Sequence, residues 1–119
     1  MPHTTTHTIG AEMRTAIDNC LSCYAICEET KVHCLHMGGR HADPEHLATL
    51  ADCARLCETS ANFMLRSSEL HHEVCRVCAE ACERCASSCE QVGGGKDDLL
   101  RRCAEECRRC AESCRQMAA

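Results

Sequence analysis

Cysteine dominates the chemistry available to this chain, because 15 of its 119 residues are cysteine. The densest stretch, Cys75 to Cys89, places five thiols at alternating spacings of three and four residues. On an α-helix this alternation puts all five thiols on one face. Such a face normally carries Leu, Ile or Val, so the pattern predicts a helix whose buried side is lined with sulfur.

Three other segments carry cysteines at similar spacings. One runs from Cys103 to Cys114 and another from Cys20 to Cys34, and a shorter one holds two cysteines. Thiolates are soft ligands that select Cu(I), zinc or iron–sulfur clusters. All of the cysteines on these faces are therefore candidate metal ligands: Cys20, Cys23, Cys27, Cys34, Cys53, Cys57, Cys75, Cys78, Cys82, Cys85, Cys89, Cys103, Cys107, Cys110 and Cys114.

The arrangement of the thiols favours Cu(I) among these metals. A structural zinc ion closes its shell with four ligands, and an iron–sulfur cluster likewise takes four thiolates around one centre. Cu(I) accepts two or three sulfurs, and thiols three or four residues apart on a helix have Cβ atoms about 5–6 Å apart. Because one monovalent ion neutralises one buried thiolate, we expect on the order of one Cu(I) per cysteine.

Other functions remain open at this point, namely a zinc or iron–sulfur binding module and a thiol redox sensor. An inert core is a weaker interpretation, since a free cysteine packs as a small hydrophobic residue but 15 on inward faces need another explanation. An enzyme is not predicted. A nucleophilic cysteine needs one activated thiol beside a base in a cleft, whereas these thiols are many and equivalent.

Four α-helices are predicted to position the thiols. The periodicity indicates helices over about 9–37, 43–66 and 69–92, and a fourth that begins at Asp97 or Asp98. Glycine pairs and triplets end the first and third helices, and Ser67-Ser68 makes a tight connection after the second. Short connections force antiparallel neighbours, so the fold class is all-α, an up-down-up-down antiparallel four-helix bundle with a cysteine-lined core.

The length predicts one domain over residues 9–119, preceded by a flexible N-terminus over residues 1–8. One Phe, one Tyr and no Trp leave a conventional core thin. The first residues have neither a basic start nor an apolar run, which argues against a signal peptide. The odd number of cysteines and the parallel Cβ directions on a helix argue against disulfides. We therefore expect a cytoplasmic protein with reduced thiols.

The charge and hydropathy of the chain exclude two classes of partner. A formal charge of -5 with mixed surface charges argues against nucleic acid. No apolar stretch reaches the roughly 20 residues of a membrane span. Apolar residues on the outer faces of the first two helices instead predict self-association: Ile17, Leu21, Tyr24, Val32, Leu35, Leu47, Phe63 and Leu65.

Histidine and methionine gather where the first and third helices end, beside glycine-rich loops. Imidazole and thioether bind Cu(I) more weakly than paired thiolates, which suits transfer of copper inward. The residues predicted to admit the metal there are His33, His36, Met37 and His46. At the opposite end, Met13, Met64 and Met117 are predicted to plug the bundle.

Three stretches resemble the bacterial four-helix-bundle copper storage proteins, in particular the cytosolic branch without an export signal. These stretches are Val32-His33-Cys34-Leu35-His36-Met37, the Cys75–Cys89 series and the Cys103–Cys114 series. The resemblance covers about residues 11–117. It implies Cu(I) storage on inward-facing thiolates, a cytoplasmic setting, a role in copper homeostasis and a homotetramer. This chain departs from the pattern in having only two cysteines in its second helix.

Overall fold

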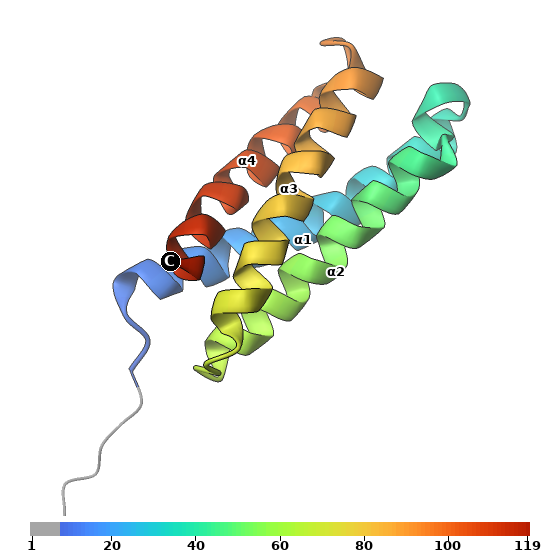
Figure 1. Ribbon diagram of the computed structural model, residues 1–119. Coiled ribbons are helices and arrows are strands. Elements are labelled where there is room, and N and C mark those ends of the chain that lie inside the picture. The colour runs from blue at the N-terminus through green and yellow to red at the C-terminus, as the bar shows by residue number, and fades with distance from the viewer. Residues whose placement is uncertain (1–7) are drawn as a thin grey trace, which may run out of the picture.

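The computed structural model describes residues 8–119, most of which lie in four long helices (Figure 1). Helix α1 spans Ala11–Met37, α2 spans Pro44–Leu65, α3 spans His71–Gly93 and α4 spans Asp98–Ala118, and a 3-10 helix, η1, spans Gly39–Ala42 between α1 and α2. The predicted flexible N-terminus lies outside the described residues except for Thr8.

Each long helix packs on two neighbours: α1 and α3 both lie against α2 and α4. The four helices therefore form a square in which α1 is diagonal to α3 and α2 is diagonal to α4. Short connections make consecutive helices antiparallel (Figure 1). The predicted all-α, up-down-up-down bundle with a cysteine-lined core is confirmed. Among the described residues, no helix is both long and apolar enough to cross a bilayer.

The bundle has two different ends. The η1 end holds η1 and the connection between α3 and α4, and the turn end holds residues 66–70 together with the start of α1 and the finish of α4. At the η1 end, Gly38 and Gly94 follow α1 and α3 with φ angles of 69° and 57°, which glycine adopts without strain. Asp97 caps α4 by accepting a hydrogen bond from the Leu100 N–H at 3.1 Å.

Two helix starts differ in detail from the sequence prediction. Helix α2 begins at Pro44, one residue after the predicted start, and the side chain of Asp43 makes no capping hydrogen bond with the described residues. Helix α3 begins at His71 rather than near Glu69, because the chain first forms a turn in which Ser67 has a φ of 52°. The 3-10 helix η1 was not predicted, since its four residues are too few for a periodic pattern.

All 15 cysteines are buried, and small alanines beside them let the helices approach closely. The buried cysteines form a column of sulfur atoms along the bundle axis, which we call the sulfur column. The largest fully buried apolar side chains of the described chain lie toward its two ends. Leu50 and Leu100 are at the η1 end, and Ile17 and Met64 are at the turn end. The placement of Ile17 on an outer face was wrong: it adjoins Ala16 in a buried stripe that is wider than the cysteine positions alone.

Candidate metal centre

The shortest contacts between sulfur atoms join different helices. The Sγ atoms of Cys20 and Cys114 lie 3.5 Å apart, between α1 and α4. Those of Cys57 and Cys82 lie 3.6 Å apart, between α2 and α3. Cysteines four residues apart on one helix are farther from each other, at 4.0 Å in each of three such contacts: Cys23–Cys27, Cys78–Cys82 and Cys110–Cys114. The thiols thus form layers across the bundle as well as the predicted series along each helix.

Sulfur also bridges the diagonals of the square. Cys27 on α1 lies 3.9 Å from Cys85 on α3. Cys57 on α2 lies 3.7 Å from Cys110 on α4. Diagonal helices are the most distant pairs in a four-helix bundle, so the sulfur atoms must fill the bundle axis. The core is therefore a continuous sulfur column rather than four separate thiol-bearing faces.

Helix α2 contributes fully to this column although it carries only two cysteines. The Cys53 Sγ lies within 3.7 to 3.9 Å of thiols on all three other helices: Cys23, Cys82 and Cys107. Cys57 makes comparable contacts with thiols of α3 and α4. The low cysteine count of α2 therefore does not leave a gap in the middle of the column.

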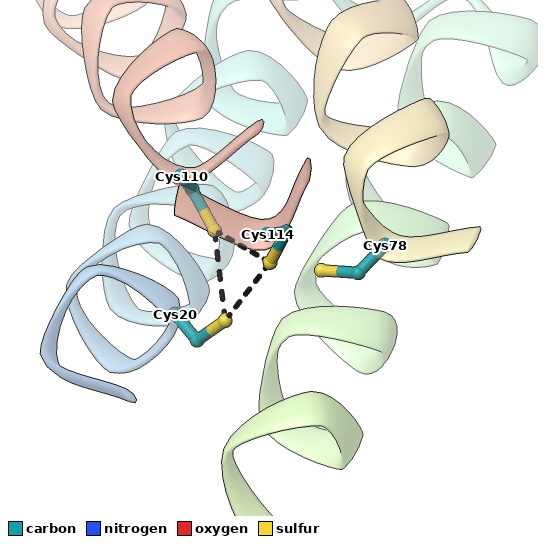
Figure 2. A group of neighbouring side chains, drawn as sticks. All are labelled: Cys20, Cys78, Cys110 and Cys114. Atoms are coloured by element: carbon teal, nitrogen blue, oxygen red, sulfur yellow. Dashed lines mark hydrogen bonds between the residues drawn. The ribbon is translucent and has the colours of Figure 1, made fainter. Parts of the chain in front are cut away.

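Several groups of four cysteines bring all four sulfur atoms within 4.8 Å of one another. One group combines Cys20, Cys78, Cys110 and Cys114, whose sulfur atoms point toward a common centre between α1, α3 and α4 (Figure 2). Other groups share members, since Cys57 and Cys82 each belong to two of them. A metal ion in one group would therefore have ligands in common with an ion in the next.

These distances suit metal ions bound by thiolates. With a metal–sulfur bond of about 2.3 Å, three sulfurs around a trigonal ion are about 4.0 Å apart, and four around a tetrahedral ion about 3.8 Å. Cys20, Cys110 and Cys114 form a triangle with sides of 3.5, 3.7 and 4.0 Å. Shifts of a few tenths of an ångström would admit an ion there. Shared ligands favour clusters of Cu(I) over separate zinc sites, each of which needs four ligands of its own.

Burial in the column favours the neutral thiol over the charged thiolate. Burial raises the pKa of the Cys34 thiol to about 11. The pKa of Cys57 is raised by its contact with Cys110, by other neighbouring thiols and by burial. A metal ion that enters must therefore displace thiol protons, and the monovalent charge of Cu(I) then replaces the charge of the proton.

At the η1 end, one histidine joins the sulfur column to the surface. The Nε2 atom of His46 lies 3.4 Å from the Cys34 Sγ, and its Nδ1 lies 2.6 Å from the Ser88 Oγ. The ring is buried, and this burial lowers the pKa of His46. A surface pocket of about 230 Å³ is lined by His46 and Ser88. His46 thus lies between solvent and Cys34, the last thiol of α1.

The other residues predicted to admit metal lie elsewhere at this end. His33 is half-buried, and its Nε2 contacts the Asp97 carboxylate rather than a thiol. His36 and Met37 are exposed on the last turn of α1, so neither side chain continues the buried face of the helix. Sequence reasoning missed Ser88, because a single serine beside a cysteine series carries no signal of which neighbouring helix it faces.

Two positions on the inward faces carry hydroxyls instead of thiols. Thr30 occupies the position between Cys27 and Cys34 on α1, and Ser60 follows Cys57 on α2. Both side chains are fully buried, and neither oxygen has a hydrogen-bond partner within the described chain. Thr30 therefore separates the pair formed by Cys34 and His46 from the main part of the sulfur column.

The chain is similar to proteins that bind copper. A family model described as copper storage protein matches residues 10–119. A protein of Nitrosospira multiformis has a similar structure, with 44% sequence identity, a TM-score of 0.83 and coverage of 90% of this chain and 94% of that one. No sequence among curated proteins matches this chain significantly.

Two further solved structures are described as copper storage proteins. The Cu(I)-bound copper storage protein 3 of Bacillus subtilis is 30% identical, with a TM-score of 0.82 and coverage of 91% of this chain and 99% of that one. The copper storage protein of Streptomyces lividans loaded with 10 copper equivalents is 26% identical, with a TM-score of 0.80 and coverage of 97% and 92%.

Proposed function

This chain belongs to the copper storage protein family, and we propose that it stores copper by holding many Cu(I) ions on the thiolates of its core. The observation that carries this proposal is the set of overlapping four-cysteine groups along the bundle axis. Each thiolate can bridge two ions, and one Cu(I) per thiolate leaves the buried column neutral. The 15 cysteines then hold on the order of one Cu(I) each.

Storage rather than catalysis is the role that suits this site. A catalytic thiol needs an activating base and access to a substrate in a cleft, whereas these thiols are buried and surrounded by other thiols. We propose that the protein works in the cytoplasm, where thiols stay reduced. The 15 free thiols of the structure support this compartment.

Copper enters, in this proposal, at the η1 end. The exposed His36 and Met37 bind the ion first, and the half-buried His33 lies near them. His46 then transfers the ion to Cys34. When the Nδ1–H of His46 donates to the Ser88 Oγ, the Nε2 lone pair is left facing the Cys34 sulfur. That tautomer offers Cu(I) one nitrogen and one sulfur before it moves on to ligand sets made of sulfur alone.

Self-association through α1 and α2, as a homotetramer, is the second part of the proposal. Helix α1 exposes Leu21, Val32 and Leu35, which lie along one outer stripe of the helix. The outer faces of α3 and α4 instead carry ion pairs, such as the one between Arg108 and Glu90. An apolar stripe on one side of a bundle favours burial against another copy.

An anaerobic titration with Cu(I) against a competing chelator tests the storage proposal. We expect uptake on the order of one copper per cysteine, reduced in Cys107→Ser but unchanged in the surface control Ser87→Ala. Saturation after one or two ions would contradict storage. Zinc held by about four thiols per ion would favour a zinc module, and a defined disulfide that forms reversibly under mild oxidant would favour a redox sensor.

Sedimentation tests the oligomer separately. We expect the wild-type chain to sediment as an assembly larger than the 13.1 kDa monomer. The double variant Val32→Glu/Leu35→Glu should dissociate it, while Val77→Glu on the exposed face of α3 serves as the matched control. A wild-type protein that sediments as a monomer would refute the proposed tetramer.

A further inference from the structure

Three metal-ligating side chains meet outside the sulfur column at the η1 end. His33 comes from the last part of α1, His41 from η1, and Asp97 from the residue that caps α4. We propose that these three residues form a second metal site, which binds one divalent first-row transition-metal ion. The site differs from the thiol core in ligand chemistry, and its existence does not depend on copper storage.

The ligand atoms converge on one carboxylate oxygen. The His33 Nε2 lies 2.8 Å and the His41 Nε2 lies 3.0 Å from the Asp97 Oδ2. The two rings are edge to face, with centroids 6.0 Å apart and an interplanar angle of 81°, so they approach the oxygen from different directions. Metal–ligand bonds of about 2.05 Å at a right angle span about 2.9 Å between ligand atoms. These two spacings match those of adjacent ligands in an octahedral shell.

Capping of α4 does not account for this convergence. The Asp97 Oδ1 alone accepts the hydrogen bond from the Leu100 N–H, which leaves Oδ2 to the two histidines. The site is sheltered, since the exposed fractions of the side chains are 13% for Asp97, 19% for His41 and 31% for His33. These three side chains have therefore lost much of their contact with water. A carboxylate beside two imidazoles is a ligand set that binds metal ions.

The carboxylate is ionised whenever the protein is near neutral pH. Desolvation raises the pKa of Asp97, but hydrogen bonds with His33, the Leu100 N–H and His41 outweigh it and hold this pKa at about 2. The triad therefore carries one negative charge when both rings are neutral. A divalent cation reverses that charge, and each ring can present its Nε2 lone pair by carrying its proton on Nδ1.

The ligand set selects a divalent ion rather than Cu(I). Two imidazoles and one carboxylate on one side of an ion form the arrangement that holds divalent iron and related metals, with the remaining positions open to water. Cu(I) prefers sulfur, which the neighbouring column supplies in abundance. An ion in the triad would also tie η1 to the start of α4, the two segments that close this end of the bundle.

Zinc added to copper-loaded protein tests the site, because bound Cu(I) keeps zinc from the thiols. Equilibrium dialysis with Zn²⁺ and metal analysis should give one zinc per chain with copper retained. His41→Gln and Asp97→Asn should weaken zinc binding by at least the roughly 10–100-fold that even an outer-shell partner is worth. Asparagine still caps α4, so Asp97→Asn keeps the helix start intact. His72→Gln, an exposed histidine at the opposite end of the bundle, is the control.

Nuclear magnetic resonance of the imidazole nitrogens gives a second readout that names the ligands. We expect Zn²⁺ to shift the Nε2 signals of His33 and His41 and to leave those of His36 in place. Zinc binding that is equal in all variants, that shifts other histidines, or that occurs only as copper leaves would overturn the proposal. Copper content in the same samples reports on storage, so failure of one proposal is distinguishable from failure of the other.

Discussion

The two ends of the bundle carry the same kinds of side chain in different surroundings. At the η1 end, His46 places one ring nitrogen 3.4 Å from a thiol and the other on a serine hydroxyl. At the turn end, the Nδ1 atoms of His71 and His72 lie 2.8 and 3.1 Å from backbone carbonyl oxygens. His46 thus contacts a thiol, whereas His71 and His72 contact backbone oxygens, and this difference supports the proposed entry of copper at the η1 end.

The surface pockets at the two ends also differ in the residues that line them. The turn end has the larger one, about 570 Å³, but its walls include Met13, His72 and Met117 and no cysteine of the described chain. One of the smaller pockets at the η1 end is lined by His46 itself. Behind the turn-end pocket, Met64 is fully buried. The proposed entry at the η1 end therefore rests on the contact between the His46 ring and the Cys34 thiol, and not on pocket size.

The largest effect is expected from Met64→Ala at the turn end. Removing a fully buried methionine leaves a cavity, which should lower the free energy of unfolding of the metal-free protein by about 2–5 kcal/mol. Urea denaturation measures this loss. Met37→Ala at the exposed end of α1 should change stability by no more than about 0.5 kcal/mol. If Met64→Ala accelerated copper uptake as well, Met64 would be a gate rather than a plug.

Next in size is the effect of His46→Leu on the rate of copper loading. Leucine fills the space of the ring but offers no nitrogen to Cu(I), so loading should slow at least about tenfold, equivalent to roughly 1.4 kcal/mol in the barrier. Stopped-flow mixing with a Cu(I)–chelator complex measures the rate. His71→Leu provides the matched change at the turn end. Equal slowing in both variants would mean that neither end is preferred.

A smaller effect should appear in the pH dependence of the metal-free protein. Burial lowers the pKa of His46 below its ordinary 6.5, so the unfolded chain takes up a proton that the folded protein excludes. Stability should therefore fall as the pH drops below 6.5, by at most about 1.4 kcal/mol per pH unit. Urea denaturation at several pH values measures the slope, and His46→Gln should flatten it. An unchanged slope in that variant would assign the effect to other groups.

Asp97 affects the pH dependence of stability in a lower pH range than His46 does. Its pKa is lowered from 3.8 to about 2, so the stability that it contributes is present above 3.8 and is lost as the pH falls through 2. The two groups can thus be told apart in one titration. Asp97→Asn should lower stability at neutral pH and flatten only the acid limb of the curve, whereas His46→Gln should flatten only the part just below 6.5.

Local patterns predicted most of this fold. The spacing of the cysteines, the glycines after α1 and α3, and Asp97 before α4 each depend on neighbours within a few residues along the chain, and the structure places them as expected. The contacts of Cys53 with three helices, and of His33 and His41 with Asp97, could not be predicted in this way. They depend on how far each helix is rotated and shifted along the bundle axis, which is a property of the packing.

The smallest expected effect comes from replacing the two buried hydroxyls by thiols. Thr30→Cys and Ser60→Cys each add one soft ligand to an inward face, so each should raise copper capacity by about one ion per chain, by the same neutrality argument.

The two variants should differ in their effect on the rate of copper loading. Thr30 lies between Cys34 and the column, so Thr30→Cys gives copper a thiol where it now meets an alcohol, and loading should be faster. Ser60 lies toward the turn end, beyond Cys57, and Ser60→Cys should leave the loading rate unchanged. If Ser60→Cys were the variant that loads faster, copper would enter through the turn end, and the assignment of the two ends would have to be exchanged.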